Sequence, residues 1–337
     1  MSKSKKIVCL GAGTGQAAVL AGLKKYDLDL CGIVNVTDNG GSSAQIRRSM
    51  NLPQPGDSRN VLTSVAKPDN VISQLFKYRF TEGELAGVSL GNYIIAALAR
   101  ITGDFGQAIE TAAEILQIPG QVLPASTTST NVCAELADGQ KICGEWEIIA
   151  RKNKTKIRKI FLEHRAPAYP LAIEKIKQAD LVIIGPGSLH TGIIPNLLMT
   201  GMAKAINTAK AIKVYICNIM TQPGLTDDYK TSDHIKAIES YLETKLDYVI
   251  VNNGRIPAKI LKAYQADGSL PVEIDDGVSR RTKLIKLDLV NRSSLEETLK
   301  DRRVFGKKSD FSKMAVWKHW IRHDSLKLAK TLVKLLN

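Results

Sequence analysis

The sequence predicts an α/β protein with a Rossmann-like, doubly wound and mostly parallel β-sheet. Short runs of β-branched and aliphatic residues alternate with amphipathic stretches along most of the 337 residues, which is typical of strands that each lead into a helix. The strand-like runs are almost continuously apolar, as expected when helices cover both faces of a sheet. The hydrophobic content of 44% can build a sizeable core, and we expect a single α/β domain over residues 1–337.

Five apolar runs are the predicted strands of this sheet. They are Lys6–Gly11, Leu30–Val36, Ala179–Gly185, Lys213–Ile219 and Asp247–Asn253. In open α/β sheets, ligands bind at the carboxyl ends of the strands, where the strand order switches. A binding site is therefore expected in the loops that follow these runs.

Two helical regions are predicted beside the sheet. Apolar repeats at i, i+3 and i+4 indicate a helical layer over about residues 60–117, interrupted at Gly91 and Gly103. Apolar residues at helical spacing indicate an amphipathic region over about residues 309–337. This last region is expected to dock on the core, and it could also form a contact in a homo-oligomer.

An inserted β-hairpin is predicted within about residues 131–150. Its strands would be Asn131–Leu136 and Lys141–Ile148, which are joined by Ala-Asp-Gly-Gln. The Asp-Gly pair favours the type I′ turn of a tight hairpin. We expect an insertion in the α/β domain rather than a second domain.

Composition indicates a cytoplasmic protein. No apolar run approaches the ~20 residues of a membrane helix, and the first residues lack the features of a signal peptide. The cysteines have neither C-x-x-C nor His-paired spacing, so we expect reduced, mostly buried thiols and no zinc site. They are Cys9, Cys31, Cys133, Cys143 and Cys217.

The formal net charge of +14 comes largely from two basic clusters, one within residues 151–159 and one from Lys300 onward. Neither cluster is interleaved with aromatic side chains in the manner of a base-stacking platform. Solvated faces that attract anionic ligands are therefore favoured over nucleic-acid binding.

The loop after the first strand is a candidate phosphate-binding turn. Its glycines let backbone N–H groups approach an anion, and a helix amino terminus follows. Gln16 stands where the dinucleotide fingerprint has its third glycine, so an NAD-binding oxidoreductase is a lesser alternative. The candidate ligand-binding residues here are Gly11, Gly13, Thr14 and Gly15.

The loop after the second strand combines hydroxyls, glycines and a carboxylate. Such a loop offers a nest of donors for an anion, and Asp38 could hold a metal ion or accept a hydrogen bond from a ribose hydroxyl. Arg47 follows about one helical turn later. The candidate residues are Asp38, Asn39, Gly40, Gly41, Ser42, Ser43 and Arg47.

Small and amide side chains follow the remaining predicted strands. Asparagine provides both donors and acceptors, which suits the edge of a base or a sugar, and His190 could contact a phosphate. The candidate residues are Gly185, Gly187, Ser188, His190, Asn218, Met220, Asn252 and Asn253.

Several stretches, in this order, carry a family resemblance. They are Asp38–Ser43, Pro55–Asn60, Ser89–Asn92, Gly185–Leu189 and Cys217–Gly224. With them, residues 7–275 resemble the YvcK-type gluconeogenesis factor family, which is related to the CofD 2-phospho-lactate transferases. The matching motifs add Arg59, Asn60 and Asn92 to the candidate ligand-binding residues.

The resemblance implies a regulator that binds a nucleotide sugar such as UDP-N-acetylglucosamine. It also implies a role in carbon metabolism during gluconeogenic growth, in the supply of cell-wall precursors and in cell shape. Under this reading the protein needs no cofactor and has no catalytic residue.

The related transferases imply an alternative, a magnesium-dependent transferase. Asp38 would then hold Mg²⁺ while Arg47 or Arg59 stabilises developing negative charge. Asp57 is either a second carboxylate of this site or a helix N-cap after Pro55-Gly56.

Overall fold

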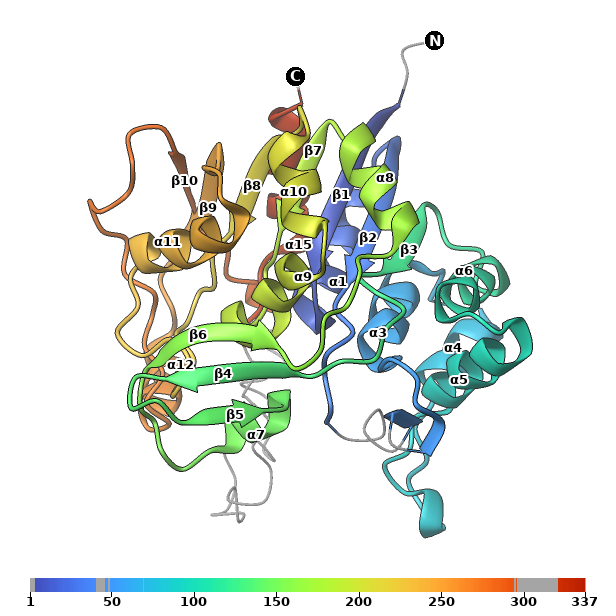
Figure 1. The fold of residues 1–337 in the computed structure, drawn as a ribbon. Helices are drawn as coiled ribbons and strands as arrows, with labels where there is room; N and C mark the ends of the chain where they lie inside the picture. Colours follow the sequence, from blue (N-terminus) through green and yellow to red (C-terminus); the bar gives the residue numbers. More distant parts are fainter. Residues whose placement is uncertain are drawn as a thin grey trace.

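The computed structural model describes residues 4–40, 46–47, 49–68, 70–293, 295 and 321–336. Its centre is a seven-stranded sheet with the order β10-β9-β8-β7-β1-β2-β3 (Figure 1). Every neighbouring pair in it is parallel. The strands are β1 (Lys5–Gly11), β2 (Leu28–Val34), β3 (Gln121–Pro124), β7 (Leu181–Ile184), β8 (Ile212–Ile216), β9 (Tyr248–Asn252) and β10 (Lys283–Leu287). The predicted Rossmann-like fold is confirmed, and β3 and β10 extend the sheet beyond the five predicted strands.

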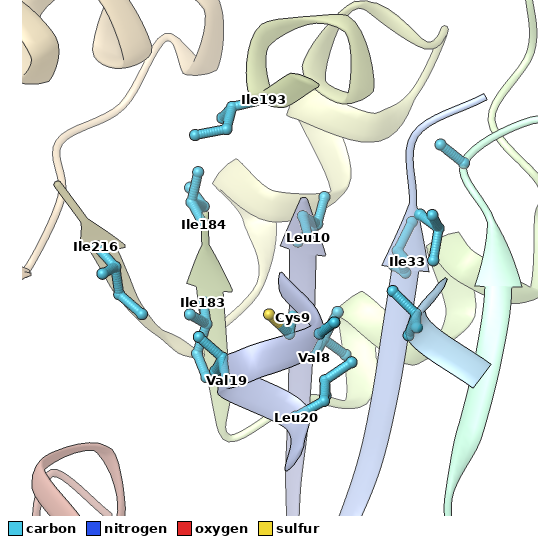
Figure 2. Packing of buried hydrophobic residues seen from close by; sticks show 14 of the residues in the cluster. Val8, Cys9, Leu10, Val19, Leu20, Ile33, Ile183, Ile184, Ile193 and Ile216 are labelled. Atoms are coloured by element: carbon cyan, nitrogen blue, oxygen red, sulfur yellow. The ribbon is translucent and has the colours of Figure 1, made fainter. Parts of the chain in front are cut away.

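The strand order reverses between β1 and β7. From β1 the chain runs outward through β2 to β3, and it later returns to place β7 on the other side of β1. Both central strands are almost completely buried: Ile7, Leu10, Ile183 and Ile184 are at most 1% exposed. Figure 2 shows Ile183 beside Val19 of the helix that follows β1, with Leu10 and Ile184 farther along the two strands. The apolar runs thus fix the centre of the sheet, and the switch in strand order lies there.

Helices cover both faces of this sheet. In Figure 1, α1 (Gly13–Leu23) lies behind the sheet, whereas α8 (Pro170–Gln178) and α10 (Met202–Thr208) lie in front of it. Four further helices follow β7 in the chain. They are η2 (Leu189–Ile193), α9 (Ile194–Leu198), α11 (Thr231–Leu242) and α12 (Ala258–Gln265).

The predicted helical layer is present. It consists of α3 (Gly56–Val65), α4 (Val71–Lys77), α5 (Leu90–Thr102) and α6 (Phe105–Ile115), with a short 3-10 turn, η1 (Gly83–Leu85). Gly103 ends α5 in a left-handed conformation, which favours glycine. The Asp104 side chain then caps α6 by accepting a 2.8 Å hydrogen bond from the Gln107 backbone.

The predicted hairpin is part of a separate antiparallel sheet with the order β5-β4-β6. Its strands are β4 (Val132–Leu136), β5 (Lys141–Cys143) and β6 (Ile157–Leu162). The expected strand over Lys141–Ile148 is correct only as far as Cys143, because Gly144 has a φ of 105° that turns the chain out of the strand. The helix α7 (Glu145–Ala150) follows instead.

A disulfide joins Cys133 to Cys143 across β4 and β5. The expectation that all cysteines are reduced is wrong for this pair, because the hairpin register places the two residues directly opposite each other. Cys9, Cys31 and Cys217 are buried free thiols, as expected.

Within the predicted carboxyl-terminal helical region, residues 309–320 and 337 lie outside the described residues. The described part contains α15 (Ser325–Lys334), whose first residues are capped by the Asp324 side chain. It packs against α1 so closely that a Cβ added to Gly22 would lie 2.2 Å from the Ser325 carbonyl oxygen. None of the helices in the described part of the chain has both the length and the apolarity needed to cross a bilayer.

Candidate functional site

A pocket of about 450 Å³ opens at the switch in strand order. The loops after β1, β2, β7 and β8 all contribute to its lining. This is where open α/β sheets bind ligands, and the volume lies within the range of small-molecule sites.

The turn after β1 forms one wall through two glycines. Gly13 has a φ of +54°, and a Cβ at Gly15 would lie 2.4 Å from the Pro186 carbonyl oxygen. The missing side chain of Gly15 therefore lets the start of α1 approach the loop after β7, while the positive φ of Gly13 favours glycine. Gln16, in place of the third fingerprint glycine, is fully buried and donates to the Cys9 and Ile33 carbonyls at 2.7 and 2.9 Å. It ties β1 to β2 beneath the pocket.

Asp38 enters the pocket from the loop after β2. Its Oδ1 accepts a 2.8 Å hydrogen bond from the Gly40 backbone. Arg47 donates to the carbonyls of Thr37, Asp38 and Thr130 at 3.2, 3.1 and 2.9 Å. Arg47 thus positions the Asp38 loop, and its own side chain does not line the pocket.

Two further carboxylates line the pocket and interact electrostatically with Asp38. Asp57 lies in the first turn of α3, whose N-cap is Pro55, and it accepts a hydrogen bond from the Gly13 backbone. Asp57 is therefore a pocket residue rather than the N-cap. Glu145, the first residue of α7, accepts a 2.8 Å hydrogen bond from the Thr191 hydroxyl.

Burial and mutual repulsion raise the pKa values of these carboxyl groups. The pKa of Asp57 rises to about 7, through burial first and the charge of Asp38 second. Burial also raises the pKa of Asp38, although hydrogen bonds from Gly40 and Glu145 and the charge of Arg47 oppose the shift. The pKa of Glu145 is raised well above its usual value by burial, then by Asp38 and Asp57. Near neutral pH this cluster either holds shared protons or favours a cation.

The chemistry of this cluster fits a hard divalent cation. No three His, Cys, Asp or Glu side chains among the described residues are arranged to ligate one ion by themselves. Mg²⁺ commonly takes only one or two carboxylates and completes its shell with water and phosphate oxygens. Asp38 and Asp57 could therefore hold it together with a phosphorylated ligand.

A further wall of the pocket carries amide, hydroxyl and aromatic groups together with one acidic and one basic residue. It includes Asn218, Tyr264 and Ser269, and its charged residues are Asp267 and Arg322. His323 accompanies them and lies 3.1 Å through Nε2 from the Cys217 carbonyl. Burial lowers its pKa to about 4, so the ring is neutral at pH 7 and donates to that carbonyl. This wall suits the edges of a base or sugar.

The structure brings one group of the predicted residues into the pocket lining. They are Gly13, Thr14, Gly15, Asp38, Gly40, Asn60, Gly187, Ser188, Asn218 and Met220. Other predicted residues are described but lie outside the lining: Gly11, Asn39, Arg47, Arg59, Asn92, Gly185, His190, Asn252 and Asn253. Gly41, Ser42 and Ser43 lie outside the described residues.

Some of the predicted residues outside the lining hold the surrounding structure. The Arg59 guanidinium donates to the Asn60 side chain at 2.6 Å, and a Cβ on Gly91 would lie 2.8 Å from Arg59. Asn39 accepts a 2.9 Å bond from the Trp146 backbone. His190 lines a separate cavity of about 420 Å³ beside β6 and α11.

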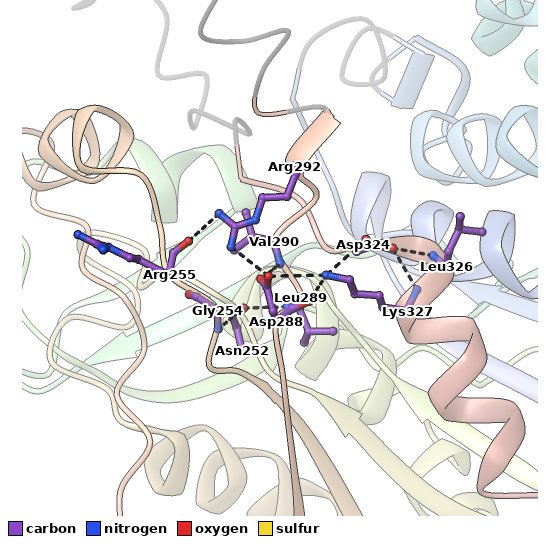
Figure 3. A network of polar contacts seen from close by, with 10 residues as sticks. All are labelled: Asn252, Gly254, Arg255, Asp288, Leu289, Val290, Arg292, Asp324, Leu326 and Lys327. Atoms are coloured by element: carbon purple, nitrogen blue, oxygen red, sulfur yellow. Dashed lines mark hydrogen bonds and ion pairs between the residues drawn. The ribbon is translucent and has the colours of Figure 1, made fainter.

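Asn252 belongs to a polar network at the end of β9 (Figure 3). Its side chain accepts from the backbone of Leu289 at 2.9 Å and donates to the Gly254 carbonyl at 3.0 Å. The neighbouring Asp288 pairs with Arg292 at 3.0 Å and with Lys327 of α15 at 3.7 Å. Asn252 therefore helps to connect β9, the end of β10 and α15.

Sequence reasoning missed Glu145, Tyr264, Arg322 and His323 as candidate site residues. Glu145 was assigned to a strand, and no motif marks the helix that carries it. Arg322 and His323 reach the pocket from near the carboxyl terminus. Only the folded chain brings these positions together.

Comparison with known proteins agrees with this architecture. Residues 7–292 match the family described as 2-phospho-L-lactate transferase CofD. The chain is 40% identical to a putative gluconeogenesis factor of Thermotoga maritima over 98% of this chain and 99% of that protein. It is 38% identical to the gluconeogenesis factor of Bacillus subtilis over 100% of this chain and 99% of that protein.

A solved structure supports the same relationship. The crystal structure of a member of the UPF0052 family from Bacillus halodurans superimposes with a TM-score of 0.86 at 33% identity, covering 99% of this chain and 100% of that chain. The sequence motifs, the parallel sheet and the full-length relatives together show that this chain belongs to the gluconeogenesis factor family, which is related to the CofD transferases.

Proposed function

We propose that this protein is a non-catalytic regulator that binds a nucleotide sugar of the UDP-N-acetylglucosamine type. The observation that carries the proposal is that one pocket combines two kinds of binding group. A glycine turn at a helix amino terminus lines it together with amide, hydroxyl and aromatic groups. A diphosphate suits the glycine turn, and a base and a sugar suit the amide, hydroxyl and aromatic groups.

The three carboxylates make a cation part of this proposal. A diphosphate placed beside Asp38, Asp57 and Glu145 meets like charge, and burial weakens the screening of that charge. Mg²⁺ held by Asp38 and Asp57 would neutralise it. Tight binding is therefore expected to depend on Mg²⁺ above about pH 7, where Asp57 loses its proton.

The names of the relatives support a role of the proposed regulator in carbon metabolism. The Bacillus subtilis and Thermotoga maritima proteins are described as gluconeogenesis factors. We extend to this chain a role in growth on gluconeogenic carbon sources. A UDP-N-acetylglucosamine sensor would connect that role to cell-wall precursor supply and cell shape, and it would act in the cytoplasm.

Isothermal titration with UDP-N-acetylglucosamine, GTP and NAD, each with and without Mg²⁺, tests this proposal. We expect the UDP-sugar to bind and NAD to give no heat, because Gln16 occupies the position of the third fingerprint glycine. Heat only from GTP with Mg²⁺ would reject the nucleotide-sugar proposal.

A magnesium-dependent transferase is the second candidate, and the carboxylate cluster favours it. Asp38 and Asp57 would hold the ion, which supplies charge neutralisation at the transferred group. Asp38→Asn should then abolish turnover even at nucleotide-sugar concentrations that saturate the variant. Unchanged binding, with no turnover in either protein across phosphorylated donors, would remove this candidate.

A further inference from the structure

The cross-strand disulfide lies two residues from a carboxylate of the pocket. Cys143 ends β5, a strand of only three residues, and Glu145 begins α7 directly after Gly144. The Gly144 backbone donates to the Val132 carbonyl at 2.8 Å. Val132 and Gly144 are thus the last hydrogen-bonded pair at this end of the hairpin, and Cys133 and Cys143 form the pair next to them.

Contacts of α7 connect this end of the hairpin to the pocket. Glu145, Trp146 and Ile149 line the pocket. The Trp146 backbone donates to Asn39 beside Asp38 at 2.9 Å, and Thr191 of η2 donates to Glu145 at 2.8 Å. A displacement of β5 would therefore move a pocket carboxylate and the residue beside Asp38.

The two sulfur-bearing residues differ in accessibility. Cys143 is exposed, whereas Cys133 is completely buried. The remaining cysteines are buried free thiols, and burial raises the pKa of Cys9, Cys31 and Cys217. An attacking thiolate can therefore reach the disulfide from the Cys143 side, while the other three thiols are shielded.

We propose that Cys133 and Cys143 form a thiol–disulfide exchange site that controls the position of Glu145 in the pocket. A thiolate of a dithiol reductant attacks Cys143 Sγ, the S–S bond breaks, and Cys133 Sγ leaves and takes up a proton. The second thiol of the reductant then displaces Cys143 Sγ, which is also protonated. Two electrons pass to the cysteine pair, and the reductant becomes a disulfide.

Reduction removes the covalent link between β5 and β4. A strand of three residues is then held by a few hydrogen bonds, so local opening of β5 and α7 becomes more frequent. Opening withdraws Glu145 from the pocket. The effect on nucleotide-sugar affinity rests on the proposed function, whereas the exchange chemistry and the local opening do not.

Hydrogen–deuterium exchange of the full chain, oxidised or treated with dithiothreitol, tests the structural part. We expect amides of residues 141–150 to exchange about tenfold faster after reduction, with little change in β1 and β7. A Cys133→Val/Cys143→Val variant retains a cross-strand apolar pair and is expected not to respond to dithiothreitol. Equal exchange in both redox forms of the wild type would overturn the proposal.

Glutathione adducts test which sulfur is attacked. Oxidised glutathione should modify Cys143 in a Cys133→Ser variant and leave Cys133 unmodified in a Cys143→Ser variant. Equal modification of both, or modification of Cys133 alone, would contradict attack at Cys143.

Titration with UDP-N-acetylglucosamine and Mg²⁺ tests the functional part. Reduction should weaken binding to the wild type by about threefold to tenfold, in proportion to the opened population, because opening of α7 removes Trp146 and Ile149 from the pocket lining and breaks the contact of Trp146 with Asn39 beside Asp38. The valine variant should be unchanged. Unchanged affinity in the wild type would overturn control of the pocket. Redox-dependent exchange of residues 141–150 without UDP-sugar binding to either form would reject the proposed function while the exchange site stands.

Discussion

Gly15 shows how a single residue determines the shape of the pocket. Its absent side chain leaves room for the Pro186 carbonyl, which would lie 2.4 Å from an added Cβ. We predict that Gly15→Ala destabilises the protein by about 1–3 kcal/mol through this overlap and weakens nucleotide-sugar binding. Urea unfolding and titration measure the two effects.

Gly187→Ala is the matched control for Gly15→Ala, because Gly187 lies in the same pocket and the nearest atom would be 3.6 Å from an added Cβ. Its free energy of unfolding should remain within about 0.5 kcal/mol of the wild type. Equal stability losses at the two glycines would contradict the close-approach explanation.

The carboxylate cluster gives a second prediction at the residue scale. Asp57→Asn removes one of the three interacting carboxylates Asp38, Asp57 and Glu145, and should stabilise the ligand-free protein at pH 8 by about 1–3 kcal/mol. The same change should abolish any stabilisation by Mg²⁺. Thermal unfolding with and without Mg²⁺ measures both effects, and Asp276→Asn, at an exposed residue outside the pocket lining, should change neither.

At the scale of elements, the position of the helix α7 depends on Arg151, the residue that follows it. This residue was expected in a solvated basic cluster, yet it is only 8% exposed. Its guanidinium donates to the carbonyls of Ile148, Gly224 and Thr155. We predict that Arg151→Met destabilises the protein by about 1–3 kcal/mol, because buried carbonyls lose their donors, and that it weakens ligand binding through α7.

Lys152→Met removes the same charge from an exposed neighbour. Its free energy of unfolding should stay within about 0.5 kcal/mol of the wild type. If both variants lose the same stability, net charge rather than the anchoring of α7 explains the effect.

The elements that the sequence could predict are those whose pattern is unambiguous. The strands β1, β7 and β8 contain continuous apolar runs, which fit a sheet covered on both faces. The sequence of β10, KLIKL, interrupts its apolar residues with lysines, and β3 has only four residues. Such short or interrupted strands depend on neighbours that periodicity does not reveal.

The site was predictable in the loops after β1, β2, β7 and β8, because strand ends converge by topology. The motifs did not separate residues that line the pocket from residues that hold it, as Arg47 and Asn252 show. Glu145 could not be found, because it begins the helix α7, which follows the separate antiparallel sheet and which no motif marks.

The whole molecule should become less stable in acid. Burial lowers the pKa of His190 to about 3 and of His234 and His323 to about 4. The unfolded chain binds protons on these rings below about pH 6.5, whereas the folded chain does not. Their stabilising effect is complete above that pH and falls by about 1–2 kcal/mol per ring at pH 5.

Urea unfolding at pH 7 and pH 5 measures this loss. His190→Phe keeps an aromatic ring and removes one titrating group, so its pH dependence should be smaller than that of the wild type. His164→Phe, at an exposed position, should leave the pH dependence unchanged, and an equal decrease in both variants would contradict the explanation.

The carboxylates act in the opposite direction. A carboxyl group with a raised pKa stabilises the fold below its unfolded value, and this contribution is lost as pH rises through the folded value, about 7 for Asp57. Mg²⁺ should therefore raise the melting temperature by about 2–4 °C at pH 8 and by less at pH 5.5, where protons compete. An equal shift at both pH values would contradict a carboxylate site.

The strands of the small antiparallel sheet all lie between β3 and β7 in the chain. One uninterrupted stretch of the gene therefore encodes this sheet. That stretch provides a charge to the pocket while the remaining walls are encoded elsewhere. Mutation or recombination within it could change the ionic character of the ligand without rebuilding the parallel core. The fold thus separates the parallel core, in which substitutions are costly, from a stretch of chain that can vary without disturbing that core.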